Sequence, residues 1–220
     1  TGVFELFIPG LAAGCGYMYE IKRQGKGTTR KLDPVSRQIS SVPITASVVS
    51  DENMPDSYAW NDGLWMIKRK KEAGKKKPVT VYEVSLTDWL KEKSADELVD
   101  FVKQEGYTHV CFLPVAEYLN EEMNGYSTLG YFTVTHRIGG SDAFKKLVDD
   151  CHNAGIGVII DWNGAYFGTE VKGLYDFDGA DAYGYLKPSL EKHPEWDVVT
   201  FDYKNCLLYT SPSPRDRQKS

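Results

Sequence analysis

Short apolar stretches alternate with helical patterns from residue 79 onward, and this alternation constrains the fold more than any other feature of the sequence. The clearest unit lies between residues 140 and 161, where an amphipathic helical pattern precedes the apolar strand Val158-Ile159-Ile160. Near-continuous apolar strands that alternate with helices predict a parallel sheet with both faces covered. The second half of the chain is therefore expected to have an α/β fold.

Three strand–helix units can be placed by their start and stop signals. Strands are expected at residues 79–86, 110–115 and 157–161. Ser94 and Glu97 form a capping box, in which each side chain satisfies a free backbone N–H at the start of a helix. A second helix is expected to begin at Ser141 as N-cap, with a long loop over residues 116–140 before it.

Glycines mark the ends of both helices. Gly106 follows the first helical pattern and Gly155 follows the second, where Phe144, Leu147 and Cys151 fall at helical spacing. A closed eight-stranded (β/α) barrel needs about 250 residues. The three units present here would make up less than half of one.

Asp161 is the candidate functional residue that position alone singles out. It ends a buried strand, and (β/α) barrels place their chemistry at the carboxyl ends of their parallel strands. An ordinary aspartate capping a turn is the alternative interpretation. Position does not decide between the two.

The first 50 residues have a different pattern. Short β-rich stretches at residues 3–8, 17–21 and 42–49 are separated by turns, which is typical of a small β-sandwich. This region is too short for a whole sandwich, so it is expected to be the C-terminal part of one. Residues 51–78 are expected to be a linker, and Trp60, Trp65 and Met66 indicate that part of it packs against something.

Charge and composition argue against nucleic acid as the main partner, against a membrane span and against a disulfide framework. The formal net charge of -5 argues against nucleic acid as the main partner, and the basic runs at 68–71 and 75–77 are expected to be a solvated face. No apolar run approaches the length of a membrane span. Scattered cysteines suggest neither a disulfide framework nor a metal site, so a reducing, cytoplasmic setting is expected.

Both ends of the chain differ from those of a complete protein. The sequence starts at Thr1 in the middle of a pattern, which favours a piece cut from something longer. Residues 206–220, CLLYTSPSPRDRQKS, resemble the conceptual translation of a sequencing adapter. This tail is expected not to belong to the native fold.

Several segments, in order along the chain, resemble one known family. The chain is similar to the 1,4-α-glucan (glycogen) branching enzymes of the α-amylase-like glycoside hydrolase superfamily. GVFELFIPG and YMYEIK resemble the end of a carbohydrate-binding β-sandwich, and DPVSRQ and YAWNDGLW resemble the linker. VYEVSLTDW, GYTHVCFLPVAEY and FKKLVDDCHNAGIGVIIDW resemble the segments around the first three barrel strands.

This resemblance implies a fold and a reaction. The fold would be the end of a β-sandwich carbohydrate-binding module (residues 1–50), a linker (51–78) and the first βα units of a (β/α)₈ TIM barrel (79–205). The family cleaves an α-1,4-glucan, holds the cut chain as a covalent glycosyl-enzyme and transfers it to a 6-hydroxyl. It needs no cofactor and no metal. The family's nucleophile and acid/base lie on barrel strands four and five, beyond this chain, so no catalytic residue is assigned and the fragment is expected to be inactive.

The resemblance also implies substrate-binding residues. Tyr126 matches a tyrosine whose ring packs against the donor sugar, and Asp161 matches an aspartate that hydrogen-bonds within the catalytic cluster. Tyr166 stands where the family usually has a histidine that binds the sugar, and it retains a hydroxyl. Asn163-Gly164 replaces the usual Val-Pro, and Asn124 replaces a tryptophan.

These departures keep other functions open. A related α-glucan hydrolase, either debranching or trehalose-releasing, is one alternative, and a non-catalytic glycan-binding paralogue is another. Four further side chains match no catalytic or metal role: Glu83, Glu117, His109 and His136. Asp176 and Asp178 lack the spacing of a calcium loop and are expected to lie in a turn.

Overall fold

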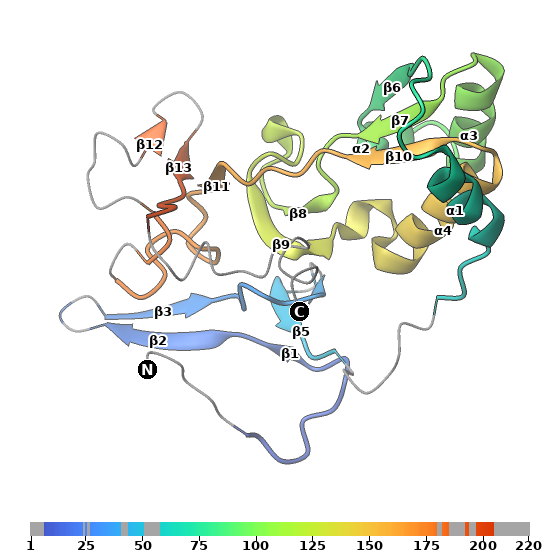
Figure 1. Ribbon diagram of the computed structural model, residues 1–220. Helices are drawn as coiled ribbons and strands as arrows, with labels where there is room; N and C mark the ends of the chain where they lie inside the picture. Colours follow the sequence, from blue (N-terminus) through green and yellow to red (C-terminus); the bar gives the residue numbers. More distant parts are fainter. Residues whose placement is uncertain are drawn as a thin grey trace.

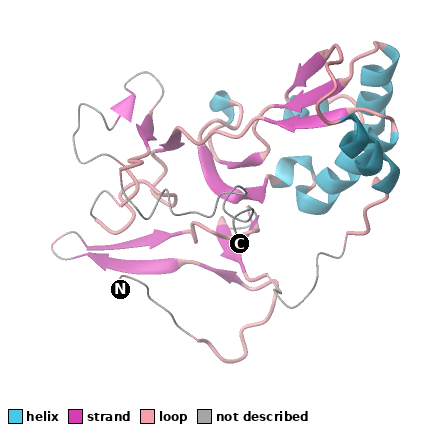
Figure 2. Cartoon of the chain, viewed as in Figure 1, coloured by secondary structure: helices cyan, strands magenta, loops and turns pink. Residues whose placement is uncertain are grey.

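The computed structural model describes residues 7–23, 25, 27–40, 44–50, 58–179, 182–184, 192–193 and 197–204. The adapter-like tail lies outside these ranges. Figure 1 shows a parallel sheet with its helices at one end of the molecule, a small antiparallel sheet at the other, and a β-rich N-terminal region along one side. Long loops join these parts (Figure 2). No helix in the described ranges is long and apolar enough to cross a membrane.

The N-terminal region consists of short antiparallel strands. They are β1 (Gly16–Tyr17), β2 (Tyr19–Arg23), β3 (Gly27–Lys31), β4 (Ile39–Ser40) and β5 (Ala46–Val48). Strands β2 and β3 form a hairpin, and β1, β5 and β4 form a second sheet. Of the predicted strand at 3–8, residues 3–6 lie outside the described ranges and residues 7–8 form no strand.

A helix lies within the predicted linker. Helix α1 (Gly63–Glu72) was not expected, because its pattern is mostly basic and none of its residues is buried. It is held by contacts to a later helix: Trp65 stacks on His152 with 3.6 Å between ring centroids, and the His152 Nδ1 lies 2.7 Å from the Asp62 carboxylate. The prediction that Trp65 packs against something is confirmed.

The predicted parallel sheet is confirmed. Strands β6 (Val81–Val84), β7 (His109–Phe112) and β10 (Gly157–Ile160) pair in parallel in the order β10-β7-β6. The helices between them are α2 (Leu86–Trp89), α3 (Ala95–Gln104) and α4 (Gly140–Asn153). Each strand therefore lies beside the next one in the sequence, as in a barrel wall.

Helices cover only one face of this sheet, so the expectation of two covered faces is wrong for the described part of the chain. The core between the sheet and the helices is formed by Val84, Leu86, Leu98, Val99, Val102, Val110, Phe112, Ile138, Phe144, Leu147, Cys151 and Ile156. On the other face Val81 and Ile159 stay 43% and 40% exposed. Cys111 is half-buried on that open face because it alternates with Val110 and Phe112.

The helix boundaries agree with the sequence signals except at one end. The capping box of Ser94 and Glu97 is present and Gly155 follows α4 with φ +84°, as predicted. The predicted N-cap Ser141 is wrong, since α4 begins at Gly140 after Gly139. A short 3₁₀ helix, η2 (His136–Ile138), leads directly into Gly139 and sets the start of α4 earlier than the side-chain signal indicates.

The predicted loop at 116–140 contains regular structure. Strands β8 (Ala116–Tyr118) and β9 (Thr128–Val134) pair antiparallel around the 3₁₀ helix η1 (Glu121–Met123). The register shifts twice along β8, so the apolar alternation that marks a strand is lost. Strand β9 also contacts the N-terminal region, where Leu129 packs with Leu32 and Ile39.

The last described part is a small antiparallel sheet. Strands β11 (Tyr166–Gly168), β12 (Lys192–His193) and β13 (Val198–Thr200) lie in the order β11-β13-β12. Phe167, Leu174, Val199 and Phe201 form its core. In the segment that follows β11, Asp176 lies in a turn and Asp178 in the adjoining bend, which agrees with the predicted turn.

Candidate functional site

Asp161 lies directly beyond β10, at the carboxyl end of the parallel sheet. Its backbone N–H donates to the carbonyl of Phe112 over 2.9 Å, so the residue continues the pairing with β7 by one position. Side chains two residues apart on a strand point to the same face, which places Asp161 on the side of Ile159, away from the helices. This is the face that a closed barrel turns inward.

Tyr126 reaches Asp161 from the segment between β8 and β9. The backbone turns through two left-handed residues, Asn124 with φ +46° and Gly125 with φ +85°. A Cβ at position 125 would lie 2.7 Å from the carbonyl oxygen of Pro114, so only glycine fits this approach to the strand end. The turn closes with a hydrogen bond of 2.8 Å from the Tyr126 N–H to the Met123 carbonyl.

The two predicted residues are in direct contact. The Tyr126 hydroxyl donates to the Asp161 Oδ2 over 2.5 Å, a length typical of a hydrogen bond to a charged acceptor. This hydrogen bond, together with burial and the Asp161 charge, raises the pKa of Tyr126 well above its usual value. The hydrogen bond holds the Tyr126 hydroxyl against Asp161, while the residue as a whole stays only partly buried.

Tyr166 lies in the neighbouring loop. The amide of Asn163 links the two segments, because its Nδ2 donates to the backbone carbonyl of Tyr126 over 2.9 Å and to that of Tyr166 over 3.2 Å. The side chain of Tyr166 is half-buried, and its electrostatic interaction with Tyr126 contributes to the raised pKa of Tyr126. All three predicted residues thus gather at one edge of the sheet.

Other side chains at this edge were not assigned a role by the sequence. Glu83 on β6 pairs with Cys111, and burial followed by the charges of Glu83 and Asp161 raises the pKa of that thiol. Trp162, next to Asp161, is 61% exposed and packs edge-on against Tyr131. The signal for Trp162 was available: a tryptophan directly after a strand-end carboxylate offers an apolar face to a sugar.

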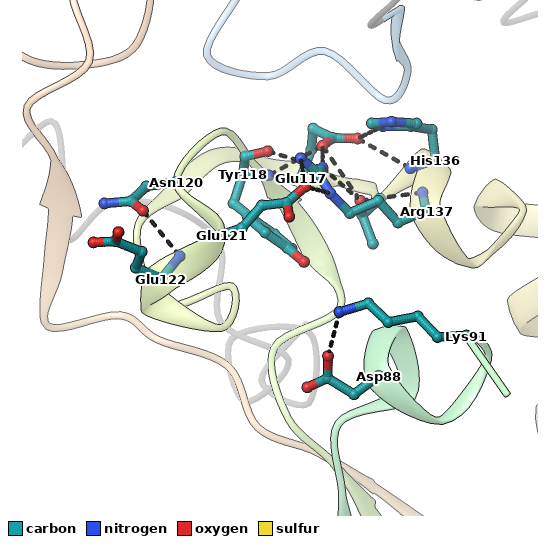
Figure 3. A network of polar contacts seen from close by, with 10 residues as sticks. Asp88, Lys91, Glu117, Tyr118, Asn120, Glu121, Glu122, His136 and Arg137 are labelled. Carbon is teal, nitrogen blue, oxygen red and sulfur yellow. Dashed lines mark hydrogen bonds and ion pairs between the residues drawn. The ribbon is translucent and has the colours of Figure 1, made fainter.

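Glu117 forms the centre of a buried polar network that the sequence did not reveal (Figure 3). Its side chain is only 3% exposed, and its Oε1 accepts from the Arg137 Nη1 over 2.8 Å. The backbone N–H and the ring Nδ1 of His136 each lie 3.0 Å from Oε2, so His136 has a carboxylate partner. Arg137 also lies over the Tyr118 ring and approaches Glu121. This network ties β8 to η2 and the start of α4.

The described surface offers no metal site at this edge. No group of three or more His, Cys, Asp or Glu side chains within the described ranges could hold a metal ion. Two open hollows are lined by other residues: Val35, Arg37, Phe132, Val134 and Ser141 in one, and Thr87, Leu90, Lys91, Glu121 and Arg137 in the other. The Tyr126–Asp161 pair itself presents an aromatic ring and hydrogen-bonding oxygens.

The architecture defines the class of protein. No protein-family model matches the chain. Among solved structures it is similar to an α-amylase-like protein from Salmonella typhimurium, with a TM-score of 0.66 and 23% identity over 92% of this chain and 32% of that one. The chain therefore has an α/β fold of the α-amylase type.

Curated relatives narrow the class. The chain is 40% identical to the 1,4-alpha-glucan branching enzyme GlgB of Methylococcus capsulatus, over 94% of this chain and 30% of that protein. It is also 40% identical to the GlgB of Kitasatospora aureofaciens, over 92% of this chain and 27% of the relative. The resemblance to branching enzymes that the motifs indicated is confirmed. The chain spans about 30% of the length of the first relatives it matches.

Proposed function

We propose that this chain is part of a 1,4-α-glucan branching enzyme. Such an enzyme cleaves an α-1,4-glucan, keeps the cut chain on a carboxylate with retention of configuration, and transfers it to a 6-hydroxyl during glycogen synthesis. The observation that supports this most strongly is the Tyr126–Asp161 hydrogen bond at the carboxyl edge of the parallel sheet. This is where a (β/α) barrel carries its active site.

The architecture we propose divides the chain into four parts. Residues 1–50 are the C-terminal part of a β-sandwich carbohydrate-binding module, and residues 51–78 are the linker. Residues 79–205 are the first βα units of a (β/α)₈ barrel, and residues 206–220 are a non-native tail. The helices on one face of β6, β7 and β10 and the open opposite face support the barrel assignment.

We assign substrate binding, and no catalytic step, to this chain. The half-exposed ring of Tyr126 can pack against the C–H face of a glucose unit. The Asp161 Oδ1 takes part in no hydrogen bond found among the described residues, so it can accept from a sugar hydroxyl. Tyr166 supplies a further hydroxyl. A retaining glycosidase needs two carboxyl groups about 5–5.5 Å apart, and this chain is assigned neither of them.

Tyr166 favours a second candidate, a glycan-binding paralogue without activity. A histidine can donate a charged hydrogen bond to a sugar oxygen and a neutral tyrosine cannot, so the replacement removes a strong donor from the reacting complex while a hydroxyl that can bind sugar remains. A related α-glucan hydrolase is the other alternative. Among the described residues Cys15, Cys111 and Cys151 are free thiols, which fits a reducing compartment such as the cytoplasm for any of these proteins.

Glucan binding is tested by titrating the 220-residue chain with maltoheptaose and measuring the dissociation constant by calorimetry. We expect Tyr126→Ala to weaken binding about three- to tenfold, the effect of losing one aromatic contact. Phe132→Ala is the matched control, since Phe132 is also aromatic and 58% exposed but lines the hollow beside Val35 and Arg37, which Tyr126 does not line. Equal effects of the two substitutions would remove the support for a sugar site at Tyr126.

Activity is tested on the protein encoded by the complete gene. Incubation with amylose should lower iodine staining with few new reducing ends if the protein branches, and should release many if it hydrolyses. An unchanged substrate together with intact maltoheptaose binding would favour the glycan-binding paralogue. The 220-residue chain by itself should leave amylose unchanged.

A further inference from the structure

Lys31, at the end of β3, is almost completely buried although it carries a charge. The residue is 1% exposed, and its ammonium donates to the backbone carbonyls of Val171 and Tyr175, each over 2.5 Å. The backbone of the next residue adds a third contact, as the Leu32 N–H donates to the Lys172 carbonyl over 2.8 Å. The end of the N-terminal hairpin is thus hydrogen-bonded to the loop that follows β11, and Figure 1 shows this loop beside β2 and β3.

The loop is shaped around this ammonium. Carbonyls from both ends of the segment 171–175 accept from one nitrogen, so the Lys31 ammonium links the two ends of this segment. Arg23, on the other strand of the hairpin, forms an ion pair with Asp176 one residue further on. Lys31 and Arg23 therefore contact neighbouring residues of the same loop, Tyr175 and Asp176.

The loop is connected to the sugar site by one hydrogen bond. Glu170, directly before the segment 171–175, accepts from the Ser127 hydroxyl over 2.7 Å. The Gly173 N–H donates to the Glu170 carbonyl over 2.9 Å, which couples Glu170 to the turn that Lys31 holds. Ser127 is 4% exposed and precedes β9, and its neighbour in the chain is Tyr126.

We propose that Lys31 is a positioning residue, which holds the loop 171–175 and, through the hydrogen bond between Glu170 and Ser127, fixes Tyr126 against Asp161. The N-terminal β-region thereby controls the geometry of the glucan site. The part of this proposal that concerns glucan rests on the proposed function. The mechanical coupling rests on the contacts alone.

The coupling is tested by amide hydrogen exchange on the 220-residue chain. Lys31→Met removes the donors and keeps the length of the side chain, and we expect amides at 168–176 and at 124–130 to exchange about tenfold faster or more. Lys31→Arg restores two donors and should return exchange to the wild-type rate. Lys22→Met is the control, because Lys22 is exposed on the same hairpin and should change neither segment.

Three exchange results would overturn the coupling. Faster exchange in α3 by the same factor would mean that Lys31 only supports the whole fold. Faster exchange at 168–176 with no change at 124–130 would mean that the loop does not reach Tyr126. Failure of Lys31→Arg to restore the rate would mean that the donors are not what matters.

A second variant keeps the proposal testable if Lys31→Met does not fold. Ser127→Ala removes the connecting hydrogen bond, so exchange should rise at 124–130 and stay unchanged at 168–176. Where the double variant can be made, it should add nothing to Lys31→Met at 124–130, as expected for two changes on one route. Additive effects would overturn the route through Ser127.

Maltoheptaose affinity tests the functional part. If the wild-type chain binds, Lys31→Met should bind about tenfold more weakly and Lys31→Arg as the wild type does. Equal affinities of wild type and Lys31→Met would overturn the role of Lys31 in sugar binding. If the wild-type chain does not bind, the proposed glucan site fails, and the exchange measurements still decide whether Lys31 positions Tyr126.

Discussion

Glu117 shows how much a single buried charge depends on its partners. Its carboxylate is 3% exposed and is matched by the guanidinium of Arg137, itself 17% exposed, with further hydrogen bonds from Thr135 and His136. A buried charge is tolerated when it is paired, and it becomes strongly destabilising when its partner is removed. Replacing Glu117 leaves the charge of Arg137 in the same buried place.

We therefore expect Glu117→Gln to lower the free energy of unfolding by about 3 kcal/mol or more. Urea unfolding followed by circular dichroism measures this. Glu121→Gln is the control, because Glu121 contacts the same arginine but is 73% exposed, and its loss should cost less than about 0.5 kcal/mol. Similar losses for both variants would show that the buried pair is not special.

Because Lys31 is buried, the free energy of unfolding of the chain should change with pH in the alkaline range. Burial lowers the pKa of Lys31 from 10.5 to about 8 in the folded chain. Between these two values the unfolded chain binds more protons at this residue than the folded chain, so stability rises with pH. This contribution to stability is fully present above the pKa of Lys31 in the unfolded chain, and it is lost as the pH falls through the pKa of Lys31 in the folded chain.

The stability of wild type relative to Lys31→Met should therefore increase between pH 8 and pH 10.5. Urea midpoints at three pH values across this window measure the difference. Lys22→Met should show no such trend against wild type. If the stability difference between wild type and Lys31→Met did not change with pH, burial would not lower the pKa of Lys31, and the expectation would be contradicted.

At the scale of elements, side-chain capping signals identified α3 and misplaced the start of α4. The Ser94 hydroxyl accepts from the Glu97 N–H over 3.2 Å, while Ser141 lies inside α4 and is exposed. Both serines have the same sequence signal, an N-cap residue before an apolar pattern. Only one of them caps a helix.

Ser94→Ala should therefore destabilise the chain by about 1 kcal/mol, the usual cost of losing an N-cap. Ser141→Ala should be neutral or should stabilise by up to about 0.5 kcal/mol, since alanine is the better helix former. Thermal unfolding of the two variants side by side checks this. Equal destabilisation would return Ser141 to the role of a cap.

Local signals predicted the elements that depend on local sequence, and they missed those that depend on distant contacts. The three strands of the parallel sheet, α3 and the glycine at the end of α4 follow from periodicity and caps within a few residues. Helix α1 depends on His152, about 90 positions away from Asp62, and β8 has an irregular register. Neither can be read from a short stretch of sequence.

The candidate site divides in the same way. Asp161 was visible as a carboxylate at a strand end, but its contact with Tyr126 joins residues 35 positions apart. The resemblance to a family brought Tyr126 forward, and periodicity could not have done so. Glu117 and Arg137 each look like ordinary surface charges in the sequence, and only the turn of η2 brings them together.

At the scale of the whole molecule, the open face of the parallel sheet is the feature with the largest consequence. On this face Val81 is 43% exposed and Ile159 is 40% exposed. Within the described ranges, β6 and β10 each pair with β7 alone, so each leaves an edge free. An exposed apolar face with free edges favours association between copies.

We expect the 220-residue chain to associate at micromolar concentration, measured by size-exclusion chromatography with light scattering. Ile159→Lys should shift it toward the monomer, because a charge on an exposed strand opposes edge pairing. Val35→Lys is the control, since Val35 is 65% exposed on another part of the surface. A monomeric wild-type chain that melts in one sharp cooperative step would contradict the expectation.

Position 125 restricts how this protein can vary. In a library with all twenty residues there, any variant with a side chain would have to displace the Pro114 carbonyl and thereby lift the neighbouring phenol from its carboxylate partner. Selection for glucan binding in such a library should return glycine alone, whereas selection for solubility should admit several residues. The missing side chain at position 125 thus allows the backbone to approach Pro114, and this approach brings the Tyr126 ring within reach of Asp161.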